Sequence, residues 1–271
     1  MRFGVTANPK SSQAVGATKK VIDVLRREHE ILIEQDLAVV LGETGSSLDE
    51  MSIDHLVTVG GDGTILRALQ MGDFNILGVN ISRVGFLTEV GLDDMERVLE
   101  ELAEGKFYID ERIKLKVRVG EKRLPDCTNE AVIHTSSLAK VRRFKVSVDG
   151  EMVSRIEGDG IIVATPTGST AYSMSAGGPV VDPRVRAFVI TALAPFRQTL
   201  RPTVVPADTS VVVELFGPGA CVMVLDGQQE SELKSGQTVH FTISEKKARF
   251  VRFSRTFYSK VNEKLMEGPA P

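Results

Sequence analysis

The first hundred residues alternate between short apolar runs and segments with helical periodicity. Arg2–Ala7 is apolar and β-prone, and it ends at the turn-forming pair Asn8-Pro9. Ser11 or Ser12 can then cap a helix, because a serine side chain accepts a hydrogen bond from first-turn N–H groups. The apolar positions of this helix recur at helical spacing: Val15, Val21, Ile22 and Leu25. The pattern predicts a strand followed by an amphipathic helix.

Three more short apolar runs follow, each bounded by Gly, Asp or Asn. They lack a clean alternation of apolar and polar residues, which is typical of parallel strands buried on both faces. We therefore predict buried strands at Ala38–Leu41, His55–Val59 and Asn75–Val79. Helical periodicity returns at Asp93–Ala103. Residues 1–105 together predict an open α/β domain.

The pattern changes after Lys106. Apolar and polar residues alternate from Ile113 to Val119, which indicates a half-buried antiparallel strand. Two Asp-Gly pairs, at 149–150 and 226–227, are strong hairpin signals. Further β-prone runs occupy 144–148, 152–156, 161–165, 211–215, 222–225 and 239–243. Residues 106–245 therefore predict a β-rich domain.

The C-terminal segment, residues 246–271, has a mixed pattern. It predicts a strand at Ala248–Phe253 and a helix at Tyr258–Met266, which can return to the first domain. The end of the chain, Gly268–Pro271, is expected to fray.

Composition narrows the class of protein. The chain has 271 residues, of which 42% are hydrophobic and 25% are charged, so it has enough apolar material for one or two cores. A net charge of −3 provides no general field that attracts nucleic acid or an anionic membrane. The two cysteines have no CxxC spacing, which argues against a disulfide framework or a structural zinc site. We see no signal peptide and no apolar run of membrane-spanning length, and we expect a cytoplasmic protein.

The sharpest motif is GGDGT at residues 60–64, between the predicted strand His55–Val59 and a helical pattern at Ile65–Leu69. Glycines allow a tight turn and a close approach of the backbone to a ligand. The helix start offers N–H groups to phosphate oxygens. Asp62 is unusual there, because a carboxylate repels phosphates unless it serves metal or proton chemistry. The alternative is a structural turn with an aspartate cap.

Two weaker blocks lie in the β-rich part. Residues 158–160 are GDG, and a predicted strand follows them. The chain then continues as TPTGSTAYS at residues 165–173, the hydroxyl-rich block, and reaches Gly177-Gly178-Pro179. Hydroxyls and loop N–H groups can bind ribose and phosphate, and a tyrosine ring can stack on a base. Alternatively, these hydroxyls only satisfy local backbone groups. The pair Asn129-Glu130 can bind sugar hydroxyls or can be an exposed strand edge.

Together, the three blocks resemble the NAD kinase family in their residues, order and spacing, most strongly from Val57 to Val181. The resemblance implies an α/β N-terminal domain and a β-rich C-terminal domain, an architecture similar to that of diacylglycerol kinases. It also implies transfer of the γ-phosphoryl group of ATP, or of inorganic polyphosphate, to the 2′-hydroxyl of the adenosine ribose of NAD, which gives NADP.

The same resemblance implies roles for particular residues. Asp62 matches the catalytic aspartate, which accepts the proton of the attacking hydroxyl. Asn129 and Glu130 match a pair that holds NAD, and 170–175 match the stretch around the adenine and its ribose. Ala194 and Gln228 align more loosely, and for Arg67 a surface role is an alternative. The nucleotide-binding residues expected on this basis are Gly61, Gly63, Thr64, Arg67, Asn129, Glu130, Asp159, Thr170, Ala171, Tyr172, Ser173, Met174, Ser175, Ala194 and Gln228.

The resemblance further implies a divalent cation, which we expect to be Mg²⁺, and a homodimer or homotetramer. The sequence identifies no metal ligands, and its four histidines form no HExxH motif. The alternatives are a lipid kinase, which shares the GGDGT loop, a phosphofructokinase-like sugar kinase, and a non-catalytic NAD-binding regulator. The hydroxyl-rich block favours NAD kinase over the first, and Asp62 argues against the last.

Overall fold

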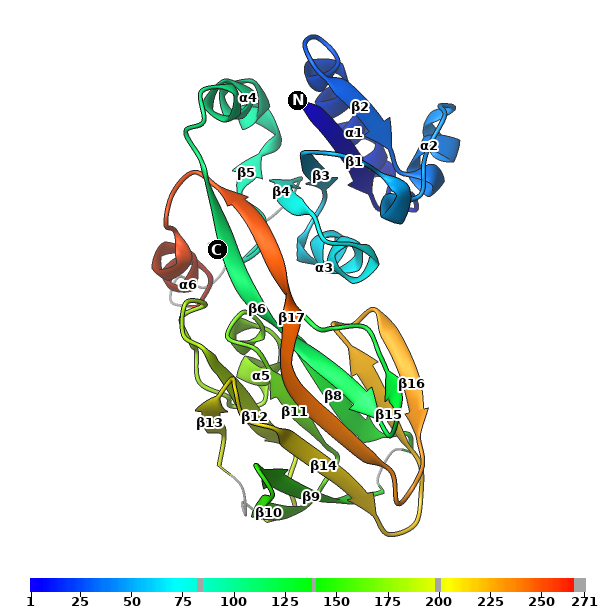
Figure 1. Ribbon diagram of the computed structural model, residues 1–271, viewed down its shortest axis with the longest axis vertical. Coiled ribbons are helices and arrows are strands. Elements are labelled where there is room, and N and C mark those ends of the chain that lie inside the picture. The colour runs from blue at the N-terminus through cyan, green and yellow to red at the C-terminus, as the bar shows by residue number, and fades with distance from the viewer. Residues whose placement is uncertain (82–84, 138–139, 198–200, 266–271) are drawn as a thin grey trace, which may run out of the picture. The chain divides into compact units, whose positions relative to one another are not determined.

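The computed structural model describes residues 1–81, 85–137, 140–197 and 201–265. The chain divides into two compact units (Figure 1). The first unit comprises Met1–Glu111 and Ala248–Pro271, and the second comprises Arg112–Lys247. Two long strands, β6 (Tyr108–Val119) and β17 (Thr238–Arg252), are each divided between the units, so that one end belongs to the first unit and the other end to the second. The first unit is therefore discontinuous in sequence.

The first unit contains a parallel sheet in the order β17-β4-β3-β1-β2. Its central strands are almost entirely buried, which agrees with their unbroken apolar runs. Ser11 caps the first helix by accepting a hydrogen bond from the Ala14 N–H at 3.2 Å. The strands are β1 (Arg2–Ala7), β2 (Glu30–Ile33), β3 (His55–Val59), β4 (Asn75–Asn80) and β5 (Val90–Gly91). The helices are α1 (Ser12–Leu25), α2 (Gln35–Leu41), η1 (Leu48–Glu50), α3 (Asp62–Met71), η2 (Leu92–Asp94), α4 (Met95–Ala103) and α6 (Phe257–Leu265).

The strand predicted at Ala38–Leu41 is wrong, because these residues form the end of α2. Only one face of α2 is buried, and Val39 is 76% exposed. The helix ends at Gly42, whose positive φ of +73° suits glycine. The strand of this region is β2, which lies just before the predicted run. A short apolar run cannot distinguish a strand from one buried turn of helix.

Arg67 of α3 pairs with Glu34, whose side chain is only 4% exposed. Both terminal nitrogens of the guanidinium contact the carboxylate at 2.7 Å, and one also donates to Thr6 Oγ1 at 2.8 Å. Thr6 Oγ1 in turn donates to Glu34. This network joins β1, α3 and the end of β2. A sequence pattern could not reveal it, because the three residues are far apart along the chain.

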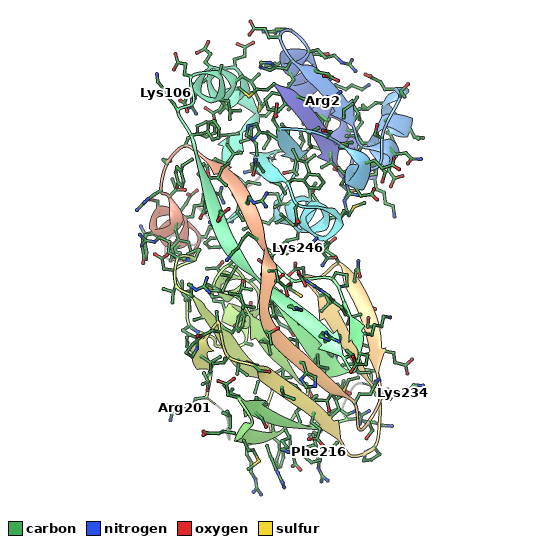
Figure 2. The ribbon with its side chains drawn as sticks, viewed as in Figure 1. Arg2, Lys106, Arg201, Phe216, Lys234 and Lys246 are labelled. Atoms are coloured by element: carbon green, nitrogen blue, oxygen red, sulfur yellow. The ribbon has the colours of Figure 1, made fainter. Side chains whose placement is uncertain are left out.

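The second unit contains two antiparallel sheets. One has the order β13-β12-β11-β8-β15-β16, and the other includes β10, β9, β14, β17 and β6. Buried apolar side chains of both sheets form one core, which includes Phe144, Phe188 and Phe241. The strands are β7 (Lys122–Arg123), β8 (Glu130–Thr135), β9 (Arg142–Val148), β10 (Glu151–Gly158), β11 (Gly160–Ala164), β12 (Ala187–Leu193), β13 (Thr203–Pro206), β14 (Val211–Phe216), β15 (Cys221–Leu225) and β16 (Gln229–Leu233). Charged side chains such as Lys106 and Lys234 lie on the exposed surface of their units (Figure 2).

Both predicted hairpins are confirmed. Asp149 and Gly150 join β9 to β10 with positive φ angles of +50° and +84°, as a two-residue hairpin turn requires. Asp226 and Gly227 also have positive φ angles, of +51° and +66°, in the longer turn 226–228 that joins β15 to β16. The helix expected at Tyr258–Met266 corresponds to α6, although Met266 and the tail expected to fray lie outside the described residues.

The glycines of the GDG block are explained by close packing. A Cβ on Gly160 would lie 2.2 Å from the carbonyl oxygen of Ile133 in β8. A Cβ on Gly158 would lie 2.8 Å from the carbonyl oxygen of Leu193 in β12. Neither position tolerates a side chain while the neighbouring backbone stays in place. The exposed residue between them, Asp159, is therefore held by a rigid segment.

Replacing Gly160 by alanine should lower the free energy of unfolding by about 1–3 kcal/mol, because the added methyl overlaps neighbouring backbone. The matched control is Gly16→Ala in α1, where a Cβ would meet nothing within 4 Å. That change should raise stability by about 0.5–1 kcal/mol, since alanine favours a helix interior. Chemical denaturation of the three proteins measures both effects. Equal stability of Gly160→Ala and the parent protein would contradict the packing argument.

Replacing Arg67 by methionine should lower the free energy of unfolding by about 1–3 kcal/mol, because the buried Glu34 carboxylate loses its cation. Arg67→Lys should lie between the two, since a point charge cannot make the forked contact. Thermal and denaturant unfolding measure the loss. If Arg67→Met is as stable as the parent chain, the ion pair has no structural role.

Candidate functional site

The GGDGT segment forms the turn between β3 and α3. Gly60 has a φ of +152°, and a Cβ there would lie 2.7 Å from Thr64 Oγ1. In contrast, a Cβ on Gly61 or Gly63 would meet no atom within 4 Å, and both residues are exposed. No side chain caps α3 at its N-cap, Gly61. The turn therefore presents open backbone at a helix N-terminus, where N–H groups can bind an anionic ligand.

Asp62 does not cap its own helix, because its carboxylate binds the loop at residues 85–88. The Phe86 N–H donates to Oδ2 at 2.8 Å, and the N–H groups of Leu87 and Thr88 donate to Oδ1 at 3.0 and 3.3 Å. A Cβ on Gly85 would lie 1.9 Å from Asp62 Oδ1, so only glycine fits there. An ionised carboxylate has about four acceptor positions, and three are used. The carboxylate is fixed and can still accept a hydrogen bond from a ligand hydroxyl.

A second carboxylate organises the site residues of the second unit. Asp226, in the turn after β15, accepts hydrogen bonds from the N–H groups of Thr128, Asn129 and Glu130 at 2.7, 2.8 and 3.1 Å. In return, its own N–H donates to the Glu130 carbonyl at 3.0 Å. The sequence pattern predicts Asp226 only as a hairpin residue. The feature that could have indicated a further role is the position of this carboxylate directly after the apolar run 222–225.

Asn129 and Glu130 have polar atoms with no partner within the described part of the chain. These atoms, Asn129 Oδ1 and Glu130 Oε2, are buried. Burial, reinforced by the charge of Asp226, raises the pKa of Glu130 to about 8. Burial also raises the pKa of Asp226, to about 6, although three backbone N–H groups oppose the rise. Near neutral pH, a mostly protonated Glu130 can therefore donate a hydrogen bond as well as accept one.

The hydroxyl-rich block packs against Asn129. Thr165 donates to the carbonyls of Asn129 (2.8 Å, from N) and Thr128 (2.5 Å, from Oγ1). A Cβ on Gly168 would lie 2.2 Å from the Asn129 carbonyl oxygen. These contacts bring Asn129, Glu130, Asp226 and the block together on one side of the second unit. The block continues as η3 (Gly168–Thr170) and α5 (Tyr172–Ser175).

Several hydroxyls of this block bond to nearby protein groups, as the structural alternative predicts. Ser169 Oγ donates to the Pro166 carbonyl at 2.7 Å, and Thr170 Oγ1 donates to the Thr167 carbonyl at 3.3 Å. Ser173 is fully buried, and its hydroxyl lies 3.1 Å from that of Thr191. The surface of the block is formed instead by Tyr172, which is 46% exposed, and by other residues of 171–175.

The remaining expected residues lie at separate points. Asp159 is exposed, and its N–H donates to the Leu193 carbonyl at 3.0 Å, which places it near Ala194. Ala194 has a positive φ of +41° although it carries a side chain. Gln228 is exposed in the turn that contains Asp226. Gly61, Asp62, Gly63, Thr64 and Arg67 belong to the first unit, and the other expected residues belong to the second.

Within the described ranges, no three or more His, Cys, Asp or Glu side chains form a group that could hold a metal ion. The donors near Asp62 are backbone N–H groups, which cannot bind a cation. The structure therefore offers no dedicated metal cage among these residues. No helix in the searched part of the chain is long and apolar enough to cross a membrane.

Comparison with known proteins supports the resemblance inferred from the motifs. The model of the ATP-NAD kinase N-terminal domain matches residues 5–107, and that of the C-terminal domain matches residues 128–253. An NAD kinase of Thermoplasma volcanium is 42% identical over 250 residues, which are 92% of each chain. An NAD kinase of Methanothermobacter thermautotrophicus is 42% identical over 276 residues, covering 99% of this chain and 97% of its own.

Solved structures agree with the two-unit architecture. An NAD kinase from Archaeoglobus fulgidus in complex with ATP has a TM-score of 0.79 and 31% identity, with 96% of both chains covered. The yeast NADH kinase complexed with NADH has a TM-score of 0.89, covering all of this chain and 88% of its own, and at 21% identity it supports the fold alone. The expected α/β plus β-rich fold is confirmed. Since the domain models and relatives above 30% identity extend over nearly the whole sequence, the chain belongs to the ATP-NAD kinase family.

Proposed function

We propose that this chain transfers the γ-phosphoryl group of ATP to the 2′-hydroxyl of the adenosine ribose of NAD and produces NADP. Family membership supports the reaction. The observation that carries the mechanism is the fixed Asp62 carboxylate, held by three N–H groups beside the open backbone of Gly61 and Gly63. An assay that contains NAD, ATP and Mg²⁺ and follows NADP formation tests the proposal. Inorganic polyphosphate in place of ATP tests the second donor.

In this mechanism, Asp62 accepts the proton of the ribose 2′-hydroxyl as its oxygen attacks the γ-phosphorus. The new bond joins the 2′-oxygen to phosphorus, the bond from phosphorus to the β,γ-bridging oxygen breaks, and ADP leaves. Phosphoryl transfer depends mainly on positioning and charge stabilisation. A carboxylate that already accepts three hydrogen bonds cannot rotate freely, so it presents its remaining acceptor position in one direction. The exposed glycines of the turn would lie against the phosphates.

The second unit would bind NAD. Asn129 Oδ1 can accept a hydrogen bond from a ribose hydroxyl, and the buried carboxyl of Glu130 can donate or accept another. A ligand that supplies these partners removes the cost of leaving the atoms unpaired. Residues 170–175 would surround the adenosine, with Tyr172 as the exposed ring. Asp159, Ala194 and Gln228 are weaker candidates for contacts with the same ligand.

A divalent cation would enter with ATP as part of that substrate. It would supply charge neutralisation at the phosphates, with ligands from phosphate oxygens and water. The preference for Mg²⁺, assembly as a homodimer or homotetramer, and a cytoplasmic location stay predictions. Kinase assays with each divalent cation in turn test the preference for Mg²⁺. A measurement of molar mass in solution tests the oligomeric state.

Asp62→Ala should lower kcat by about 10²–10⁴ while NAD affinity changes little, because the general base is lost. Asp62→Asn is harder to interpret, because it can also disturb the loop. Its amide must fit against three N–H donors, so its Nδ2 faces at least one of them. Steady-state kinetics of both variants measure the loss of the base, and a thermal melt of each shows whether the fold is disturbed. Near-normal turnover in folded Asp62→Ala would show that this carboxylate is not the base.

Tyr172→Ala should raise KM for NAD several-fold, whereas KM for ATP changes less, because the exposed ring offers a stacking surface worth about 0.5–1.5 kcal/mol. Tyr172→Phe keeps the ring, so the difference between the two variants measures the contribution of the hydroxyl. The measurement is kinetics with each substrate varied in turn. An unchanged KM for NAD in the folded alanine variant would place the adenosine elsewhere.

A further inference from the structure

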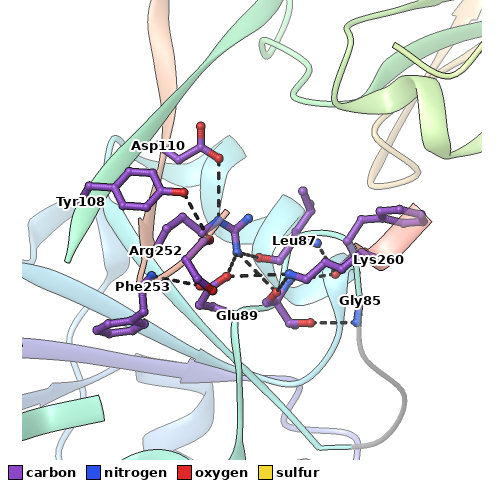
Figure 3. Close-up of polar contacts among 12 residues, drawn as sticks. Gly85, Leu87, Glu89, Tyr108, Asp110, Arg252, Phe253 and Lys260 are labelled. Atoms are coloured by element: carbon purple, nitrogen blue, oxygen red, sulfur yellow. Dashed lines mark hydrogen bonds and ion pairs between the residues drawn. The ribbon is translucent and has the colours of Figure 1, made fainter. Parts of the chain in front are cut away.

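The loop at residues 85–88 is held from two sides. Its N–H groups at Phe86, Leu87 and Thr88 face the Asp62 carboxylate. Its carbonyl groups at Leu87 and Thr88 face two buried cations from the C-terminal part of the chain, Arg252 and Lys260 (Figure 3). The loop therefore lies between an anion that orients the N–H groups and cations that orient the carbonyls.

Arg252 is linked to Asp62 through a single peptide unit. Its Nη1 donates to the Leu87 carbonyl at 3.0 Å. The N–H of that same peptide unit, on Thr88, donates to Asp62 Oδ1 at 3.3 Å. Because a peptide unit is planar, a rotation that displaces the carbonyl also displaces the N–H. A charged donor at the carbonyl also polarises the amide and strengthens the bond that its N–H makes.

Lys260 of α6 holds the adjoining peptide. Its Nζ donates to the Thr88 carbonyl at 2.6 Å, and Arg252 Nη1 lies 3.3 Å from the same oxygen. The N–H of that peptide, on Glu89, donates to the Gly78 carbonyl of β4 at 2.8 Å. The loop is therefore attached to the central sheet on one side and to α6 on the other.

Two carboxylates balance the two cations. Glu89, whose side chain is 4% exposed, lies 2.7 Å from Arg252 Nη1 and 3.7 Å from Lys260 Nζ. Its other oxygen accepts the Phe253 N–H at 3.0 Å, and Asp110 lies 3.7 Å from Arg252 Nε (Figure 3). Buried charges are tolerated when they are paired and hydrogen-bonded, and both cations are paired here, although Arg252 Nη2 is a buried atom with no hydrogen-bond partner among the described residues. Both cations bind carbonyl groups of the loop, at Leu87 and Thr88, so they can act on Asp62 through these two peptide units.

We propose that Arg252 and Lys260 are positioning residues for phosphoryl transfer, which fix the carbonyl side of the loop so that its N–H groups hold Asp62 in the reacting orientation. The inference rests on the proposed role of Asp62 as the base. It assigns a function to the C-terminal helix α6, which carries none of the family motifs identified in the sequence.

Lys260→Met is the test variant, because Glu89 keeps its ion pair with Arg252 when Lys260 is removed. Removing Arg252 would instead leave Glu89 without its closest cation, so that variant risks misfolding. A misplacement of about 1 Å can cost about 100-fold in rate, so we expect kcat to fall about 10- to 100-fold. KM for NAD and for ATP should each stay within about twofold, because a positioning residue acts through Asp62 and not on substrate binding.

Three comparisons make the result specific. Lys260→Arg keeps a cation that can reach the same carbonyl and should recover most of kcat. Lys20→Met makes the same change at an exposed lysine of α1 and should leave kcat unchanged. In an Asp62→Ala background, Lys260→Met should cost little further rate, since a residue that acts through Asp62 has nothing left to position.

The outcomes separate the two proposals. No NADP formation by the unaltered chain, or full activity of Asp62→Ala, would overturn the proposed function or the role of the base. If both hold and folded Lys260→Met keeps its kcat, the positioning role is wrong. It is also wrong if Lys260→Met costs the same factor with and without Asp62, or if the KM values rise in parallel with the loss of kcat. A thermal melt of every variant distinguishes a lost orientation from a lost fold.

Discussion

A single carboxylate that accepts three consecutive backbone N–H groups organises each unit of this protein. Asp62 holds residues 86–88 in the first unit, and Asp226 holds residues 128–130 in the second. Loop N–H groups removed from water need acceptors, and a carboxylate satisfies several at once through charge-assisted bonds. The hydroxyl-rich block packs against the second of these anchored segments through Thr165 and Gly168.

The close glycine contacts follow from this arrangement. Gly85 allows the loop to approach Asp62, and Gly168 allows the hydroxyl-rich block to approach Asn129. In both cases the missing Cβ makes room for protein atoms. Within the GGDGT segment, Gly61 and Gly63 instead leave open space that a ligand could fill. The glycines of the motifs therefore serve two physical purposes, and their spacing in the sequence does not reveal which one applies.

The sequence was sufficient for features governed by local interactions. Both Asp-Gly hairpins and the buried strands β1, β3 and β4 depend on short segments, which predict them. A serine cap is predicted at Ser11 or Ser12, and Ser11 forms it. The motif order was sufficient for the family, which the comparisons confirm. The error at Ala38–Leu41 arose because a short apolar run is compatible with either a strand or a helix turn. Glu34 with Arg67, Asp226 with Thr128, and Arg252 with Leu87 are pairs distant in sequence, and no local pattern brings such partners together.

The discontinuity of the first unit has a consequence for biosynthesis. The GGDGT turn and the loop at 85–88 are made early, but Arg252 and Lys260 follow only after the whole second unit has been translated. Until then the carbonyls of Leu87 and Thr88 lack the donors that they have in the finished protein. Synthesis runs at about 5–20 residues per second, so translation of the second unit, Arg112–Lys247, delays the last strand and helix of the first unit by about 7–27 s. A chain that ends just before Ala248 would retain the three motif blocks and still lack Arg252 and Lys260, which bind the loop at Asp62.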